Sequence, residues 1–240
     1  VAIGQNAGDH ATGSYNTFVG GKAGMGGTTS APFSSGTNNV AVGYQALTAF
    51  TTAFHSVAIG HSAMKDNTQG NYNTAVGNNA LRENTTGGAN TALGYAAGFS
   101  LNGGNYNVLV GNGAGYSLAG ASNNILIGDE AGTNINNANA NGTVAVGHEA
   151  LKALTSGPAN TAIGHQAGLA MTTNSSNTII GYGAFRAADA GEDNNVVIGL
   201  DAGAAINHAN ADDNVLIGYQ AGYGGANSLR QSVAIGSNAL

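Results

Sequence analysis

Three histidines that directly follow a recurring glycine are the residues of this sequence whose type and position could do chemistry. They are His61, His148 and His165, and the last two stand one 17-residue repeat apart. Imidazole binds metal ions and titrates near neutral pH, so a column of histidines could form a metal site, an anion site or a pH-sensitive point. Tyrosines fill the same position in other repeats, at Tyr44, Tyr95, Tyr182 and Tyr219. We therefore favour a ladder of stacked aromatic and polar side chains at a turn, with His148 and His165 as its candidate site.

Acidic residues gather toward the C-terminal end of the chain, where they could attract Ca²⁺. They are Asp189, Glu192, Asp193, Asp201, Asp212 and Asp213. They lack the glycine–aspartate nonapeptide of calcium-binding β-rolls, so we expect a solvated acidic surface. The sequence has no cysteine and no HExxH motif, and its Ser, His and Asp residues form no recognisable triad. We expect no catalytic residue, no bound metal and no cofactor.

The glycine that precedes these histidines belongs to a repeat that fills the whole chain. The repeat glycines are Gly4, Gly20, Gly43, Gly60, Gly77, Gly94, Gly111, Gly128, Gly147, Gly164, Gly181, Gly199, Gly218 and Gly236. Seven of the thirteen intervals are 17 residues, and the others are 16, 18, 18, 19, 19 and 23. The residue before the glycine is always Ile, Val or Leu, and the third residue after it is always Ala. A glycine that recurs in this way sets the course of the backbone rather than holding one ligand.

Each copy of the repeat predicts a short β-strand. A β-branched residue, a small or aliphatic residue and a second aliphatic residue precede the glycine, so both faces of the strand are apolar and we expect both to be buried. Threonine shares the first column with Val and Ile, which have a similar shape, and this favours a buried column. The threonines are Thr17, Thr74, Thr91, Thr161 and Thr178. Asn stands four residues before the glycine in ten of thirteen copies, which predicts a ladder of side-chain amides bonding successive coils.

The segments between these strands are rich in turn-forming residues, as in KDNTQGNY and RENTTGGA. One strong strand and two turns in each repeat predict an all-β solenoid, with about fourteen coils stacked about 4.8 Å apart. One apolar face of the strand then lies inside the solenoid, and the other forms a surface stripe with much Ala and Gly. Because such a stripe would be a large exposed patch on a monomer, we expect chains to associate, and three around a common axis are the natural number.

The copies SVAIGHSAM (56–64) and SVAIGSNAL (232–240) resemble the repeat of the YadA-like head domain of trimeric autotransporter adhesins. Similar repeats occur in phage tail-fibre-like proteins and trimeric bacterial surface fibres. The resemblance covers all fourteen copies and implies a left-handed parallel β-roll, an interlocked homotrimer and adhesion at the cell surface. The family's head repeat is shorter than the 17 to 19 residues found here, so we expect the extra length in the outer turn. No binding residue is transferred, because the matching positions are structural ones.

The function that these features predict is that of a non-catalytic head or shaft segment of a trimeric fibre. It would be extracellular, attached to a cell surface or outer membrane or part of a virion fibre. The net charge of −6 predicts no affinity for nucleic acid, and no apolar run is long enough to span a membrane. We expect residues 1–240 to form a single repeat domain of a longer protein, since neither end looks like a capping repeat.

Irregular loops are where we expect contacts with a partner, such as a surface glycan or a protein receptor. The 23-residue interval holds an insertion at 25–36, and the next coil carries further aromatic residues. The candidate residues are Pro32, Phe33, Phe50, Phe54 and His55. Each contact would be weak, and three-fold symmetry would multiply it. The alternative is that the three phenylalanines pack against a neighbouring chain.

Two other functions are compatible with parts of the pattern. IGHQAG also fits the hexapeptide of triangular left-handed β-helices, a fold that acyltransferases use with a histidine as general base. That coil needs an aliphatic residue on each of three faces, and KDNTQGNYN, between Gly60 and Gly77, supplies none for the other two. The threonine column would suit binding to ice, but Val and Ile interrupt it.

Overall fold

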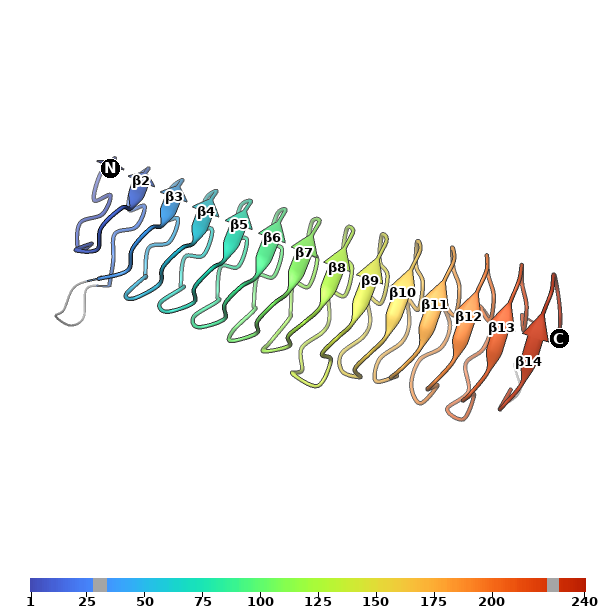
Figure 1. The fold of residues 1–240 in the computed structure, drawn as a ribbon. Coiled ribbons are helices and arrows are strands. Elements are labelled where there is room, and N and C mark those ends of the chain that lie inside the picture. The colour runs from blue at the N-terminus through green and yellow to red at the C-terminus, as the bar shows by residue number, and fades with distance from the viewer. Residues whose placement is uncertain (28–33, 224–228) are drawn as a thin grey trace. The chain divides into compact units, whose positions relative to one another are not determined.

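The chain winds as an all-β parallel solenoid in each of two compact units. The computed structural model describes residues 1–27, 34–223 and 229–240. The first unit, Val1–Ala121, holds β1 to β7, and the second, Ser122–Leu240, holds β8 to β14 (Figure 1). The strands are β1 (Ala2–Ile3), β2 (Thr17–Val19), β3 (Val40–Val42), β4 (Val57–Ile59), β5 (Thr74–Val76), β6 (Thr91–Leu93), β7 (Val108–Val110), β8 (Ile125–Ile127), β9 (Val144–Val146), β10 (Thr161–Ile163), β11 (Thr178–Ile180), β12 (Val196–Ile198), β13 (Val215–Ile217) and β14 (Val233–Ile235). The predicted β-solenoid is confirmed, whereas its left-handedness and the association of three chains stay predictions. In the part of the chain described, no helix has the length and apolar character needed to cross a membrane.

Within each unit, every strand pairs in parallel with the next strand along the chain, and the pairing joins equivalent repeat positions. In β4 and β5, Ala58 lies opposite Ala75 and Ile59 opposite Val76. The same register holds between β9 and β10 in the second unit. Because equivalent positions are neighbours, each column of the sequence repeat becomes a column of side chains in space, one coil spacing apart.

The middle residue of each strand points into the solenoid, and its two neighbours point outward. Ala75 and Leu109 are fully buried, whereas Thr74 is exposed and Leu93 retains 49% of its accessible surface. The prediction that Ala lies along the outer stripe is therefore wrong, because the middle residue of the strand lies inside. Burial of the other face, with its Thr column, needs a neighbouring chain and stays a prediction. The constant Ala of the following turn also points inward, so the narrow interior holds Ala from the turns and either Ala or a larger residue such as Leu109 from the strands. The first and third residues of the strands, which are Thr, Val, Ile or Leu, form the outer stripe.

The asparagine before each strand forms the predicted ladder inside the fold. The Oδ1 of Asn73 accepts a hydrogen bond from the backbone N–H of Asn90 at 2.9 Å, and Asn90 does the same for Asn107 at 2.9 Å. The Nδ2 of Asn90 also donates to the carbonyl oxygen of Gly104 at 2.8 Å. These side chains are fully buried, so their bonds satisfy backbone groups that have no strand partner.

Candidate functional site

The turn after each strand sets the direction of the histidine column. Gly147 and Gly164 both have φ of +139°, and a β-carbon on Gly147 would lie 2.3 Å from the carbonyl oxygen of Gly164. Adjacent coils therefore touch through their backbones at this corner, and only glycine fits. The residue that follows the glycine projects its side chain outward in the same direction on successive coils.

Equivalent repeat positions lie side by side on adjacent coils, so the rings that follow the glycine can stack. The predicted stacking of His148 on His165 is confirmed. Their ring centroids lie 5.1 Å apart with planes 12° from parallel, and His165 stacks on Tyr182 at 4.7 Å. In the first unit Tyr44 stacks on His61 at 5.6 Å. The Nδ1 atom of His165 is buried and has no hydrogen-bond partner among the described residues. Aromatic stacking between coils thus accounts for the three histidines of this column.

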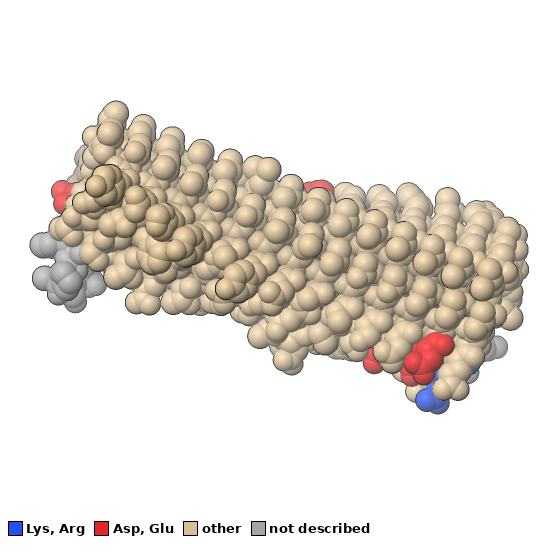
Figure 2. Space-filling view, in the orientation of Figure 1, with Lys and Arg blue, Asp and Glu red and all other residues tan. Residues whose placement is uncertain are grey.

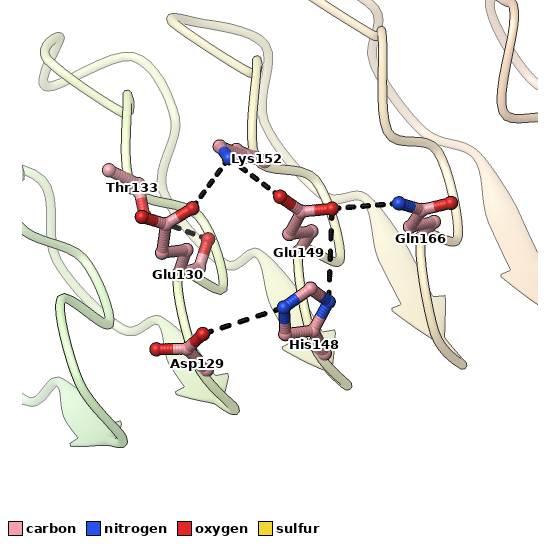
Figure 3. Close-up of polar contacts among 7 residues, drawn as sticks. All are labelled: Asp129, Glu130, Thr133, His148, Glu149, Lys152 and Gln166. Carbon is pink, nitrogen blue, oxygen red and sulfur yellow. Dashed lines mark hydrogen bonds and ion pairs between the residues drawn. The ribbon is translucent and has the colours of Figure 1, made fainter.

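A charged cluster surrounds His148 and joins three coils of the second unit (Figure 3). The Nζ of Lys152 lies 2.5 Å from Oε2 of Glu130 and 2.7 Å from Oε1 of Glu149. The Nε2 of Gln166 donates to the other carboxylate oxygen of Glu149 at 2.8 Å. The hydrogen bond from Lys152, followed by that from Gln166, holds the pKa of Glu149 below its ordinary value. The bonds to Glu130 and Glu149 raise the pKa of Lys152. At neutral pH the cluster therefore holds one ammonium group between two ionised carboxylates, and its net charge is negative.

The imidazole of His148 lies at the edge of this cluster. Its Nε2 is 3.4 Å from Oδ2 of Asp129, and its Nδ1 is 3.7 Å from Oε2 of Glu149 (Figure 3). A paired histidine of this kind can act as a base only next to a nucleophile or substrate. The nearby hydroxyl of Thr133 instead donates to the backbone oxygen of Glu130 at 2.8 Å. Over residues 1–27, 34–223 and 229–240, no three His, Cys, Asp or Glu side chains are placed to hold a metal ion.

The candidate partner-contact residues do not form one surface. Pro32 and Phe33 lie outside the described residues. Phe50 is fully buried, with its ring 5.5 Å from that of Phe18, so its prediction as a contact residue is wrong. It stands seven residues after a repeat glycine, where Leu101 also turns into the core. The sequence segment looks like a loop, but this position completes the inner packing of the coil.

Phe54 and His55 gather around a residue that the sequence interpretation missed. Tyr72 packs edge-on against Phe54 at 5.2 Å and stacks on His55 at 5.4 Å with planes only 2° apart. Phe54 is half-buried, and His55 and Tyr72 are exposed. Tyr72 stands five residues before a repeat glycine, and tyrosine recurs there at Tyr15 and Tyr106. That recurrence was the available signal for a second aromatic column.

One member of the acidic cluster is not on the surface. Glu192 is fully buried, and its carboxylate accepts hydrogen bonds from the Nδ2 of Asn174 at 2.6 Å and the backbone N–H of His208 at 3.0 Å. Burial raises its pKa above the ordinary value. The prediction of a solvated surface is therefore wrong for Glu192, whose partner His208 lies in the 19-residue interval between Gly199 and Gly218.

A shallow hollow of about 220 Å³ opens beside the second aromatic column. Tyr72 and Tyr106 line it together with Asn71, Thr86 and Asn105. It has apolar ring faces and neutral polar groups, a combination suited to binding rather than to acid–base chemistry.

Known proteins provide no further assignment. No protein-family model matches the chain, and comparison with curated proteins and with solved structures gives no significant match. Function is therefore inferred from the residues and geometry of the chain.

Proposed function

We propose that this chain is a non-catalytic segment of a trimeric extracellular fibre, in which it acts as a spacer and as an adhesive head. The observation that supports this most is the outer apolar stripe, defined as the first and third residues of the strands β2 to β14. Its members belong to β2 to β7 in the first unit and to β8 to β14 in the second, so the stripe is a regular product of the repeat rather than a local irregularity.

The stripe exposes large apolar side chains in register. Leu93 retains 49% of its accessible surface, Ile125 40% and Ile163 39%, although each belongs to a paired strand. Figure 2 shows that the face turned toward the viewer carries few charged side chains, and that these lie near its edges. Exposed apolar side chains in register within each unit are stabilised by association with another chain.

Three copies around one axis would bury the stripe of each chain and leave the turns outside. Tyr72, His55 and the cluster around Lys152 would then face solvent in three copies, where weak contacts gain strength by avidity. Within each unit, the solenoid also keeps its two ends at a fixed distance, because each coil adds about 4.8 Å. Attachment to a cell surface, outer membrane or virion is the setting that this role requires.

Light scattering after size-exclusion chromatography tests the proposal. The expected molar mass is three times that of the chain, and Leu93→Lys in the stripe should shift it toward the monomer. Asn78→Lys is the matched control, since it adds the same charge at an exposed turn position outside the stripe. A wild-type protein that stays monomeric at high concentration contradicts the proposal.

Binding to ice is a second candidate, favoured by the outward direction of the threonine column. Thr74 and Thr91 are exposed on neighbouring coils of the single chain. The column is interrupted by valine, for example at Val57 and Val108. Inhibition of ice growth by the wild type, lost in Thr74→Tyr, would support this function, and unchanged ice growth would dismiss it.

A further inference from the structure

We propose that the hollow between Tyr72 and Tyr106 is a binding slot for the neutral pyranose ring of a surface glycan. This inference rests on the adhesive role proposed above and assigns that role a site and a ligand class. Tyr72, Ala89 and Tyr106, which share one repeat position on consecutive coils, line the slot. Asn71, Thr86 and Asn105 also line it.

The slot exists because one coil lacks an aromatic side chain. Tyr72, Ala89 and Tyr106 occupy the same repeat position on three consecutive coils and share one backbone conformation, with φ of +58°, +55° and +59°. The two tyrosines are therefore two coil spacings apart, about 9.6 Å. They retain 61% and 67% of their accessible surface, so both rings stand out from the solenoid with an empty place between them.

Stacked pairs on adjacent coils show that one ring fits against a tyrosine at one coil spacing. His55 stacks on the other face of Tyr72 at 5.4 Å, and His165 stacks on Tyr182 at 4.7 Å, each pair across one coil spacing. A six-membered ring at the level of Ala89 would lie at a similar distance from both tyrosines. The slot therefore accepts a single ring between two aromatic faces.

The surroundings favour a pyranose over a flat aromatic ligand. A pyranose presents C–H groups on both faces, which suit the electron-rich faces of two tyrosines, and hydroxyl groups around its edge. The hydroxyl of Thr86 and the Nδ2 of Asn71 make no hydrogen bond to any described residue, and both residues line the slot. Two bonds fix the amides, one from the N–H of Phe54 to Oδ1 of Asn71 at 2.9 Å and one from the N–H of Gly88 to Oδ1 of Asn105 at 2.8 Å.

The absence of charge around the slot narrows the ligand further. The residues that line it are Asn, Tyr, Thr, Gly and Ala, with no ionisable side chain except the tyrosine phenols. A carboxylated or sulfated sugar would find no cation there to bind. We therefore assign the slot to neutral hexoses or N-acetylhexosamines within a larger glycan.

The test uses a glycan array to find a neutral ligand, and then isothermal titration calorimetry with the methyl glycoside of its terminal pyranose. Ala89→Tyr should abolish binding, because it inserts the missing ring while keeping both walls, and Tyr106→Ala should weaken binding about tenfold or more. Ala159→Tyr is the matched control, because Ala159 has the same repeat position and φ of +61° but no tyrosine on the adjacent coils. It should bind as the wild type does.

Three results would overturn the slot: no neutral glycan bound, binding that Ala89→Tyr leaves unchanged, or phenol bound more tightly than the methyl glycoside. Light scattering of the same samples separates the two proposals. A trimer that binds no glycan rejects the slot and keeps the fibre, whereas a monomer that binds through the slot rejects the fibre alone.

Discussion

Gly98 and Leu109 share one volume of the core from adjacent coils, since a β-carbon on Gly98 would lie 2.5 Å from Cδ1 of Leu109. One coil earlier the sizes are reversed, with Leu81 followed by Ala92, and both of these residues are fully buried. The interior of the coil has no room for two large side chains at this point. The size of one residue therefore limits the size of the other.

Exchanging the two sizes should restore most of the stability that each single change removes. Leu109→Ala leaves a cavity and should cost about 2–5 kcal/mol, and Gly98→Leu overpacks the core at a cost of about 1–3 kcal/mol or more. The double variant recreates the arrangement of Leu81 and Ala92, and Leu81 itself has φ of +49°, close to the +61° of Gly98. Urea unfolding followed by tyrosine fluorescence measures all three free energies. Strictly additive losses would contradict the shared volume.

The repeat glycine should tolerate no side chain where another coil follows. Gly77 has φ of +140°, and its added β-carbon would lie 2.2 Å from the carbonyl oxygen of Gly94. Gly77→Ala should therefore cost at least about 3 kcal/mol, from strain and steric clash together. Gly236→Ala has a similar φ of +129° but meets nothing within 4 Å, so its thermal unfolding reports the strain alone. Equal losses in the two variants would show that the contact between coils is unimportant.

Asn90 should be replaceable by serine more easily than by alanine. Asn90→Ala leaves the N–H of Asn107 and the carbonyl oxygen of Gly104 buried without their partner, at a cost of about 2–5 kcal/mol. Serine occupies the equivalent position in another coil, where Oγ of Ser56 accepts the N–H of Asn73 at 3.2 Å. Chemical denaturation of both variants should show about half the loss for Asn90→Ser. An equal loss would mean that the ladder bond contributes nothing.

Glu192 should make the protein less stable as the pH rises above the ordinary carboxyl range. Its folded pKa is raised by burial, so the folded state holds the proton more tightly than the unfolded state does. Stability is therefore highest below the unfolded pKa and falls through the window up to the folded pKa, by at most about 1.4 kcal/mol per pH unit. Melting curves between acidic and neutral pH should show this slope in the wild type. Glu192→Gln should flatten it, and an unchanged slope would assign it to other groups.

Lys152 should contribute modestly to stability through its two carboxylate partners. Lys152→Met should cost less than about 1 kcal/mol, because the pair is partly exposed and solvent screens it. The lowered pKa of Glu149 means that this contribution is present above the ordinary carboxyl pKa and is lost as the pH falls through the folded value. The raised pKa of Lys152 keeps the contribution intact through neutral pH.

Lys65→Met is the matched control for Lys152, because both lysines stand five residues after a repeat glycine. Thermal unfolding at neutral pH should show a larger loss for Lys152→Met, and a smaller difference at acidic pH or at high salt. A difference that persists in high salt would mean that packing, not charge, is responsible.

The sequence by itself determined the solenoid, its single strand per coil, the asparagine ladder and the stacking of His148 on His165. Each of these follows from a local pattern repeated along the chain at nearly constant spacing. Once parallel pairing sets equivalent positions side by side, a column in the sequence must become a column in space.

Only the tertiary structure decided which face of the strand lies inside. Alternation along the sequence defines two faces of a strand but does not show which of them points into the solenoid. The turn-rich segments between strands also predict Phe50 in a surface loop and Glu192 in water, although the folded coil buries both. The slot between Tyr72 and Tyr106 likewise depends on how far the coils separate two rings that lie 34 residues apart in the chain. Packing across coils decides these points, and it acts between residues that are distant in the sequence.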